Sequence, residues 1–232
     1  MAKALAWFGG AGLAVCMAGA AVPCRAETPR ELLTQAGFVD RDRDTALGRI
    51  ARAQQLASAA LTRSPDDQEA AMMQAMAAGY RAKLLGSRTD AIAARKRFEM
   101  LAQRFPRNAE AQAALGAWHV GVIAKLGRFV GRAAAGAQKD AGYAALDRSV
   151  AMGGNRAMFS GFAGLLRLEL DPSDVRGRAL VEAASKAPAP TPVDTYVRRA
   201  SVAVLAALRE GNAKTAQALA DKLLPFGQIP ND

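Results

Sequence analysis

Helix-breaking residues recur along this 232-residue chain, and most of the breaks are followed by residues that favour a helix start. Thr28 and Glu31 are spaced as a capping box, and Pro29 stands at the first helical position, where proline is well tolerated. Residues 64–67 and 171–174 combine serine, aspartate and proline in the same way. Between the breaks, apolar residues recur every three or four positions. This pattern predicts an all-α chain.

Composition agrees with close-packed helices. Alanine supplies 55 residues and aromatic residues only 13, so the core must be built from small side chains. β-Sandwiches and β-barrels need strands rich in β-branched and aromatic residues, and we find no convincing strand. We expect helices over about 40–62, 65–85, 89–105, 155–170 and 213–224, one after an N-cap at Asn108 that runs to about 126, and one after an N-cap at Thr191 that runs to about 209. A helix with Ala144, Leu146 and Val150 should end at Gly153, and another should run from the break at 171–174 to about 185. A short first helix follows Thr28, and residues 187–192 form a stiff proline-rich spacer.

The first 26 residues have the features of a signal peptide. Lys3 gives a positive start, residues 4–22 are uncharged, and small residues precede a cleavage position after Ala26. An earlier cut after Ala20 fits the same rule, and an uncleaved membrane anchor is the alternative interpretation. Cys16 lies in a poor match to a lipoprotein box because Val15 precedes it. We therefore expect a periplasmic or secreted protein, with residues 27–225 as its helical domain and 226–232 as a C-terminal tail.

Removal of the signal peptide would remove both cysteines, so the exported chain could form no disulfide and would depend on its core for stability. The formal net charge of the whole chain is +10. In a cytosolic protein such a charge would suggest nucleic acid, but export removes most of that argument. We expect no nucleic-acid partner and no membrane-spanning segment after cleavage.

A repeated pattern surrounds the breaks at Pro65, Pro106 and Gly154. It is clearest around Pro106, where a small residue, an aromatic and an apolar residue precede the proline, and a Leu-Gly pair and a ring residue follow it: Ala94, Phe98, Leu101, Leu115, Gly116 and His119. This order resembles the tetratricopeptide repeat (TPR) family. The breaks are 41 and 48 residues apart, whereas that family repeats every ~34 residues. The resemblance implies a divergent right-handed superhelical array of antiparallel helix pairs, a TPR-like α-solenoid.

The chain also resembles, in architecture more than in motif, the periplasmic repeat subunits that accompany tripartite solute transporters. That resemblance implies a second possible role, a periplasmic solute-binding accessory subunit with a lined cavity. The first role, implied by the TPR resemblance, is a non-enzymatic scaffold that binds a protein or peptide partner.

Few residues could support catalysis or metal binding. His119 is the only histidine, and its place in the repeat favours a structural role over catalysis. Asp40, Asp42 and Asp44 are spaced like the start of a calcium loop, but position six is Thr45 and position twelve is Ala51, so we reject that site. Residues 127–136 are rich in glycine but match no phosphate-binding motif, and we expect a mobile loop there. The sequence predicts no enzyme, no cofactor and no metal site.

The TPR resemblance implies that one wall of each inner helix lines a concave binding face. This register places Met72, Met76 and Tyr80 on that face. Methionine adapts to irregular apolar partners, although methionine at helical spacing is also typical of a core. Positions that carry Lys and Asn in carboxylate-binding members of the family are Ala113 and Ala117, so that specialised function is not expected. The remaining candidate binding residues are Trp118, Arg128 and Arg167, and Arg128 and Arg132 could contact an anion.

Overall fold

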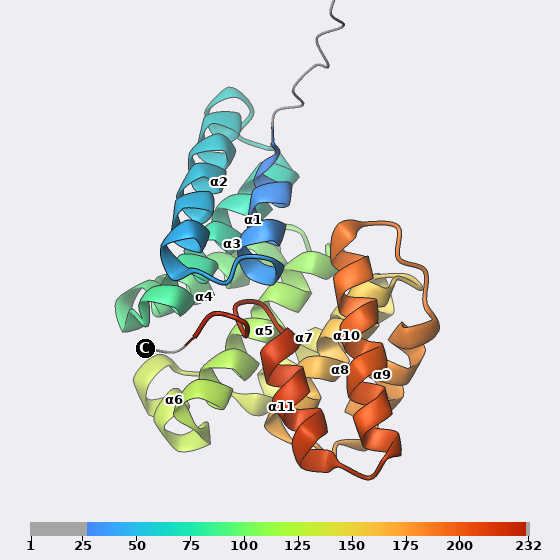
Figure 1. The fold of residues 1–232 in the computed structure, drawn as a ribbon. Helices are drawn as coiled ribbons and strands as arrows, with labels where there is room; N and C mark the ends of the chain where they lie inside the picture. Colours follow the sequence, from blue (N-terminus) through green and yellow to red (C-terminus); the bar gives the residue numbers. More distant parts are fainter. Residues whose placement is uncertain (1–26, 231–232) are drawn as a thin grey trace, which may run out of the picture.

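The computed structural model describes residues 27–230, and the prediction of an all-α chain is confirmed over this range (Figure 1). The expected signal peptide lies outside the described residues. The helices are α1 (Pro29–Phe38), α2 (Arg43–Arg63), α3 (Gln68–Leu85), α4 (Arg88–Arg104), α5 (Ala109–Leu126), α6 (Arg128–Ala135), α7 (Lys139–Met152), α8 (Ala157–Leu170), α9 (Val175–Lys186), α10 (Pro192–Arg209) and α11 (Ala213–Leu223).

Side-chain caps begin most of these helices. Thr28 and Thr191 each form a capping box, with Glu31 and Asp194 as the reciprocal acidic partners. Asn108 caps α5 as predicted, by accepting a hydrogen bond from the backbone N–H of Ala111 at 3.0 Å. At the two clusters of serine, aspartate and proline, 64–67 and 171–174, the last aspartate is the cap: Asp67 for α3 and Asp174 for α9. Each helix therefore begins after its cluster and not within it.

The loop expected at 127–136 is instead helix α6, and this prediction was wrong. Alanine and arginine are strong helix formers, and they lie between two glycines that make the turns at either end. Gly127 and Gly136 have φ values of 78° and 74°, which only glycine adopts readily. Arg88 Nε and Arg95 Nη1 donate to the carbonyls of Ala134 and Ala135, so two α4 side chains hold the end of α6.

When the short helix α6 is set aside, helices that follow one another in the sequence pack together, for example α2 with α3, α5 with α7, and α8 with α9. Alternate helices are also in contact: α1 with α3, α3 with α5, α5 with α8, and α8 with α10. Two of the pairs cross where glycines meet. A Cβ on Gly116 would lie 2.9 Å from the carbonyl oxygen of Gly142, and one on Gly164 would lie 2.9 Å from that of Gly177. These backbones therefore approach too closely for any larger residue.

Two hydrophobic cores result. The first is built from α1 to α5, the end of α6 and the chain's last described residues, and the second from Val120 of α5 and helices α7, α8, α9, α10 and α11. Leu170 at the end of α8 packs against both cores. Helix α1 also reaches the second half of the fold, because the rings of Phe38 and Tyr196 stack with centroids 5.7 Å apart.

The residues after α11 return to the first core (Figure 1). We call residues 224–230 the C-terminal segment. Phe226 and Ile229 are only 6% and 8% exposed and belong to the core formed with α1, α2 and α3. The expected tail at 226–232 is therefore packed against the helices as far as the structure describes it.

Candidate interaction site

The predicted binding residues on α3 lie together, but other parts of the chain cover them. Met72 is 2% exposed and belongs to the first core, whereas Met76 and Tyr80 are partly buried beside it. The ring of Tyr80 meets the ring of Phe226 edge-on, with centroids 4.8 Å apart. A Cβ on Gly37 of α1 would lie 3.3 Å from the Tyr80 ring. This face of α3 is thus filled by α1 and the C-terminal segment.

A small set of contacts holds the C-terminal segment there. The backbone N–H of Phe226 donates to the carbonyl of Gly37 at 2.8 Å, and Lys83 Nζ donates to the carbonyl of Pro225 at 3.0 Å. Lys83 Nζ also lies 5.9 Å from the centre of the Phe226 ring. Phe226 has φ 69°, which is unusual for a residue other than glycine. Burial raises the pKa of the Tyr80 phenol, so Tyr80 is neutral in this site. The segment is therefore bound by hydrogen bonds to its backbone and by its buried side chains Phe226 and Ile229, as a peptide ligand would be.

Trp118 lies in the core beside α4. Its indole N–H donates to the carbonyl of Ala91 at 2.8 Å, and the Arg95 guanidinium lies 5.6 Å from its ring centre. Only about 9% of Trp118 is exposed. Its contacts with Ala91 and Arg95 tie α5 to α4.

His119, its neighbour in sequence, is also structural in its contacts. Its Nδ1 accepts a hydrogen bond from the backbone N–H of Gln138 at 3.2 Å. Burial, and to a lesser extent the positive charge of Arg95, lower the pKa of His119 to about 4. The imidazole is therefore neutral near pH 7 and acts as an acceptor that anchors the start of α7.

Arg167 is a buried arginine that pairs with acidic residues of α7 and of the start of α9. Its side chain is 7% exposed, and it donates to Asp147 Oδ2 at 2.8 Å and to Asp174 Oδ2 at 3.4 Å. Its guanidinium stacks 4.0 Å from the ring centre of Tyr143, whose other contacts include Lys139 at 5.1 Å. Arg167 thus joins three helices of the second core and does not face the Tyr80 site.

Arg128, the last of the predicted residues, is exposed on α6, and this helix has an unusual distribution of side chains. Its buried residues are the small ones, Gly131 and Ala135, whereas Phe129 and Val130 are 87% and 57% exposed. Leu126, at the end of α5, is 43% exposed beside them. Surface helices normally bury their large apolar residues, so this reversed arrangement marks α6 as a candidate contact surface.

Two features of these surfaces were missed in the sequence. The C-terminal segment contains Phe226 and Ile229, two large apolar residues beyond the last helix, and these signal a segment that packs. No acidic residue occurs between Glu110 and Asp140, a stretch that includes α6 and the basic residues Lys125, Arg128 and Arg132. That local charge imbalance could have identified the α6 surface.

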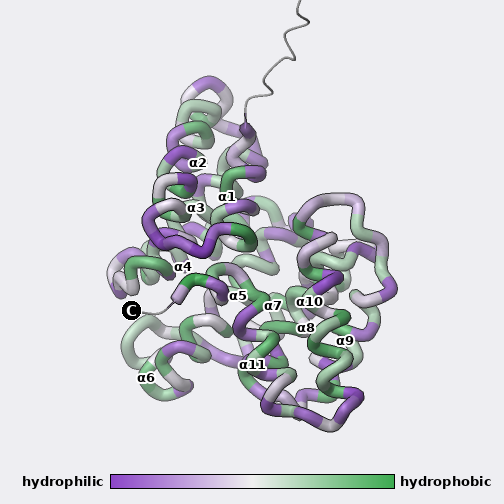
Figure 2. The backbone as a smooth tube through the Cα atoms, in the orientation of Figure 1, coloured by the Kyte–Doolittle hydropathy of each residue, from purple (hydrophilic) through white to green (hydrophobic). Residues whose placement is uncertain are grey.

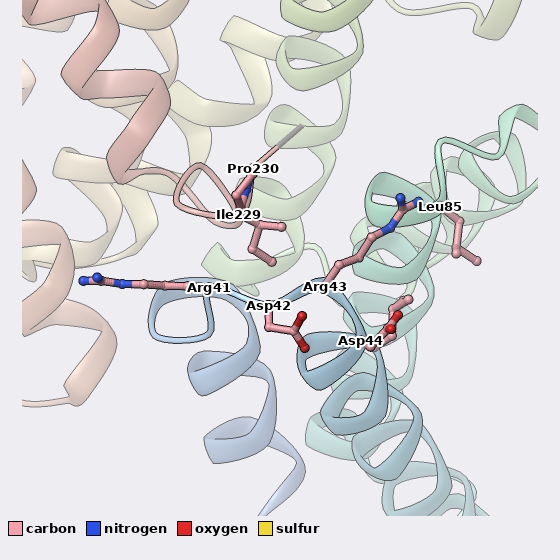
Figure 3. A pocket seen from close by; sticks show the side chains of 8 residues that line it. Arg41, Asp42, Arg43, Asp44, Leu85, Ile229 and Pro230 are labelled. Carbon is pink, nitrogen blue, oxygen red and sulfur yellow. The ribbon is translucent and has the colours of Figure 1, made fainter. Parts of the chain in front are cut away.

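A hollow of about 470 Å³ opens beside the start of α2, between the end of α3 and the C-terminal segment (Figure 3). Its lining includes Arg41, Asp42, Leu85 and Ile229. The Asp42 carboxylate is engaged as the cap of α2, where it accepts hydrogen bonds from Thr45. None of the predicted binding residues lines this hollow.

Within residues 27–230, no group of histidine, cysteine, aspartate and glutamate side chains is arranged to hold a metal ion. No helix in the same range is both long and apolar enough to cross a membrane. Comparison of the chain with protein-family models, curated proteins and solved structures found no match.

Proposed function

We propose that this chain is a non-enzymatic, exported helical-repeat protein that acts as a protein–protein interaction scaffold in the periplasm or outside the cell. In this proposal the helices form a TPR-like α-solenoid of five antiparallel pairs: α1 with α2, α3 with α4, α5 with α7, α8 with α9, and α10 with α11. The contacts between alternate helices support this arrangement, because α1, α3, α5, α8 and α10 would then form the inner layer.

The binding site of this scaffold is the face formed by α1 and α3 around Tyr80. The observation that carries the proposal is the position of the C-terminal segment, which lies on this face through Phe226. Tyr80 provides an aromatic surface, Gly37 provides a backbone acceptor, and Lys83 provides a donor for a backbone carbonyl. A partner segment of the same kind, extended and with one aromatic side chain, would use the same three groups. The chain's own segment then competes with the partner.

The test measures binding of a fluorescent peptide with the sequence of residues 224–230 to the chain that begins at Glu27. In the native chain the tethered segment competes at an effective concentration on the order of millimolar. Phe226→Ala weakens that competitor, so we expect the F226A chain to bind the peptide at least about tenfold more tightly than the native chain. Adding Tyr80→Ala should abolish the gain.

The matched control is Phe129→Ala, which removes a phenylalanine that does not touch the site. It should leave the weak binding of the native chain unchanged. Circular dichroism confirms that each variant is folded. Equal peptide affinity for the native and F226A chains, or tight binding that survives Tyr80→Ala, would exclude this face as the partner site.

A further inference from the structure

Helix α6 projects its large apolar side chains away from both cores. Figure 1 shows α6 at the edge of the molecule, separate from α10 and α11. Gly131 packs against α5, where a Cβ would lie 3.4 Å from Val122. Ala135 is buried in the first core. Phe129 and Val130 consequently lie on the opposite side, in solvent. Burying them against this chain would require α6 to rotate about its own axis.

Several contacts fix α6 in this orientation. The side chains of Arg88 and Arg95 bind its last carbonyls, and the backbone N–H of Ala137 donates to the carbonyl of Gly131 at 3.2 Å. The exposure of Phe129 therefore follows from a helix held at its end and along its buried side. It is not the result of a free loop.

All of the charged residues of α6 and of the last two positions of α5 are basic. Three basic residues are exposed here together with the three apolar ones: Lys125 and Leu126 at the end of α5, and Arg128, Phe129, Val130 and Arg132 on α6. Figure 2 shows hydrophobic and hydrophilic residues together along this helix. We call these six residues the α6 patch. The nearest acidic residues in the sequence are Glu110 and Asp140, outside α6 and its two turns.

We propose that the α6 patch docks the protein on the surface of a membrane that contains anionic lipids. Phe129, Val130 and Leu126 would enter the boundary between headgroups and acyl chains, and the three basic residues would contact lipid phosphates. The patch has only three large apolar side chains, two on the eight-residue helix α6 and one at the end of α5, whereas a stable protein interface buries roughly 800 Å² per partner. A lipid surface needs no complementary pocket, and each basic residue strengthens binding to it roughly fivefold.

The test is co-sedimentation of the chain that begins at Glu27, which contains all described helices and both cores but not the apolar residues 4–22. One set of vesicles contains equal parts phosphatidylglycerol and phosphatidylcholine, and the other contains phosphatidylcholine alone. We expect at least about tenfold stronger binding to the anionic vesicles, and a large loss of that binding in high salt. A Phe129→Trp variant should show a blue-shifted emission with the anionic vesicles only.

Two double variants separate the contributions of apolar and charged residues. Phe129→Ser with Val130→Ser, and Arg128→Glu with Arg132→Glu, should each lower binding at least about tenfold, and neither should change the melting temperature much because these side chains are exposed. Val175→Ser is the matched control, since Val175 is 82% exposed on α9 but lies outside the patch. Its binding should equal that of the native chain.

Three results would overturn the proposal. The first is equal binding to the two kinds of vesicle, and the second is binding that survives loss of Phe129 and Val130. The third is a dimer that depends on Phe129 while no vesicle binding occurs, which would assign the patch to a second copy of this chain. None of these results bears on the Tyr80 site, so the proposed scaffold function is tested separately.

Discussion

Replacing Asp194 with alanine is expected to lower the free energy of unfolding by about 3–5 kcal/mol, the cost of breaking a buried ion pair. Asp194 is fully buried near the start of α10, and Oδ2 accepts from Arg156 Nη2 at 2.9 Å and from the Thr191 hydroxyl at 2.6 Å. Oδ1 accepts from the backbone N–H of Met158 at 2.9 Å, in the first turn of α8. One carboxylate therefore satisfies the starts of two helices.

The electrostatic balance at this carboxylate supports the prediction. Burial alone would raise the pKa of Asp194, but the hydrogen bonds from Arg156, Thr191 and Met158 outweigh burial and lower the pKa below its usual value. Alanine would leave the partly buried Arg156 without its partner, would remove the acceptor for the Met158 N–H at the start of α8, and would remove the acidic half of the capping box of α10. Urea denaturation followed by circular dichroism measures the loss.

Asp66→Ala is the control for the Asp194 variant. Asp66 also pairs with an arginine, Arg104, but its side chain is 93% exposed. An exposed pair of this kind contributes about 0–1 kcal/mol. If the two alanine variants lose similar stability, the Asp194 network does not hold α8 to α10.

The second large effect is a pH dependence of stability caused by His119. Its pKa is lowered from 6.5 to about 4 in the folded state, so the unfolded chain binds a proton between these values while the folded chain does not. The contribution of neutral His119 to the free energy of unfolding is therefore complete above pH 6.5 and is lost as the pH falls toward 4. A shift of this size corresponds to about 3 kcal/mol.

In the native chain, Glu169 offsets this effect because its titration changes the free energy of unfolding in the opposite direction. Burial, offset in part by Lys83, raises the pKa of Glu169 from 4.5 to about 7, so its contribution is complete below pH 4.5 and is lost as the pH rises toward 7. Glu169→Gln removes this opposing term. We expect the E169Q chain to lose stability from pH 6.5 to 4 more steeply than the native chain.

The added substitution His119→Asn isolates the histidine. Asparagine places an acceptor near the position of Nδ1, where it can still receive the hydrogen bond from Gln138, but it does not titrate. The E169Q/H119N chain should lack about 3 kcal/mol of the acid-dependent loss seen for E169Q. If the free energies of unfolding of these two variants change equally with pH, His119 is not buried as a neutral acceptor.

Local signals predicted the helices well, and they failed where distant parts of the chain decide the structure. The caps at Thr28, Asn108 and Thr191 are local hydrogen bonds, so the residue types alone were sufficient. Helix α6 depends in part on Arg88 and Arg95, which come from α4 and are remote in the sequence. The glycines around α6 suggested a loop because glycine predicts a turn from its residue type alone, whereas the contacts with α4 cannot be predicted from the local sequence.

The same distinction applies to the candidate site. Helical spacing placed Met72, Met76 and Tyr80 on one side of α3, where they do lie together. No periodicity could show that Phe226, far along the chain, covers Tyr80, because that contact depends on the direction taken after α11. The repeat register predicts that Arg167 lies on the binding face, but its partners Asp147 and Asp174 lie on other elements and hold it elsewhere.

A disulfide between the C-terminal segment and α1 would show whether this segment occupies the α1–α3 face. A Cβ on Gly37 would lie 3.4 Å from the Cβ of Pro225, close to the separation that a disulfide requires. Both native cysteines precede Glu27, so the chain that begins there contains only introduced thiols. We expect the Gly37→Cys/Pro225→Cys pair to oxidise almost completely in air, as measured by mass spectrometry and non-reducing electrophoresis, whereas Val175→Cys/Pro225→Cys stays reduced. If the first pair stays reduced in the folded chain, the C-terminal segment does not occupy the α1–α3 face, and the proposed binding site loses its support.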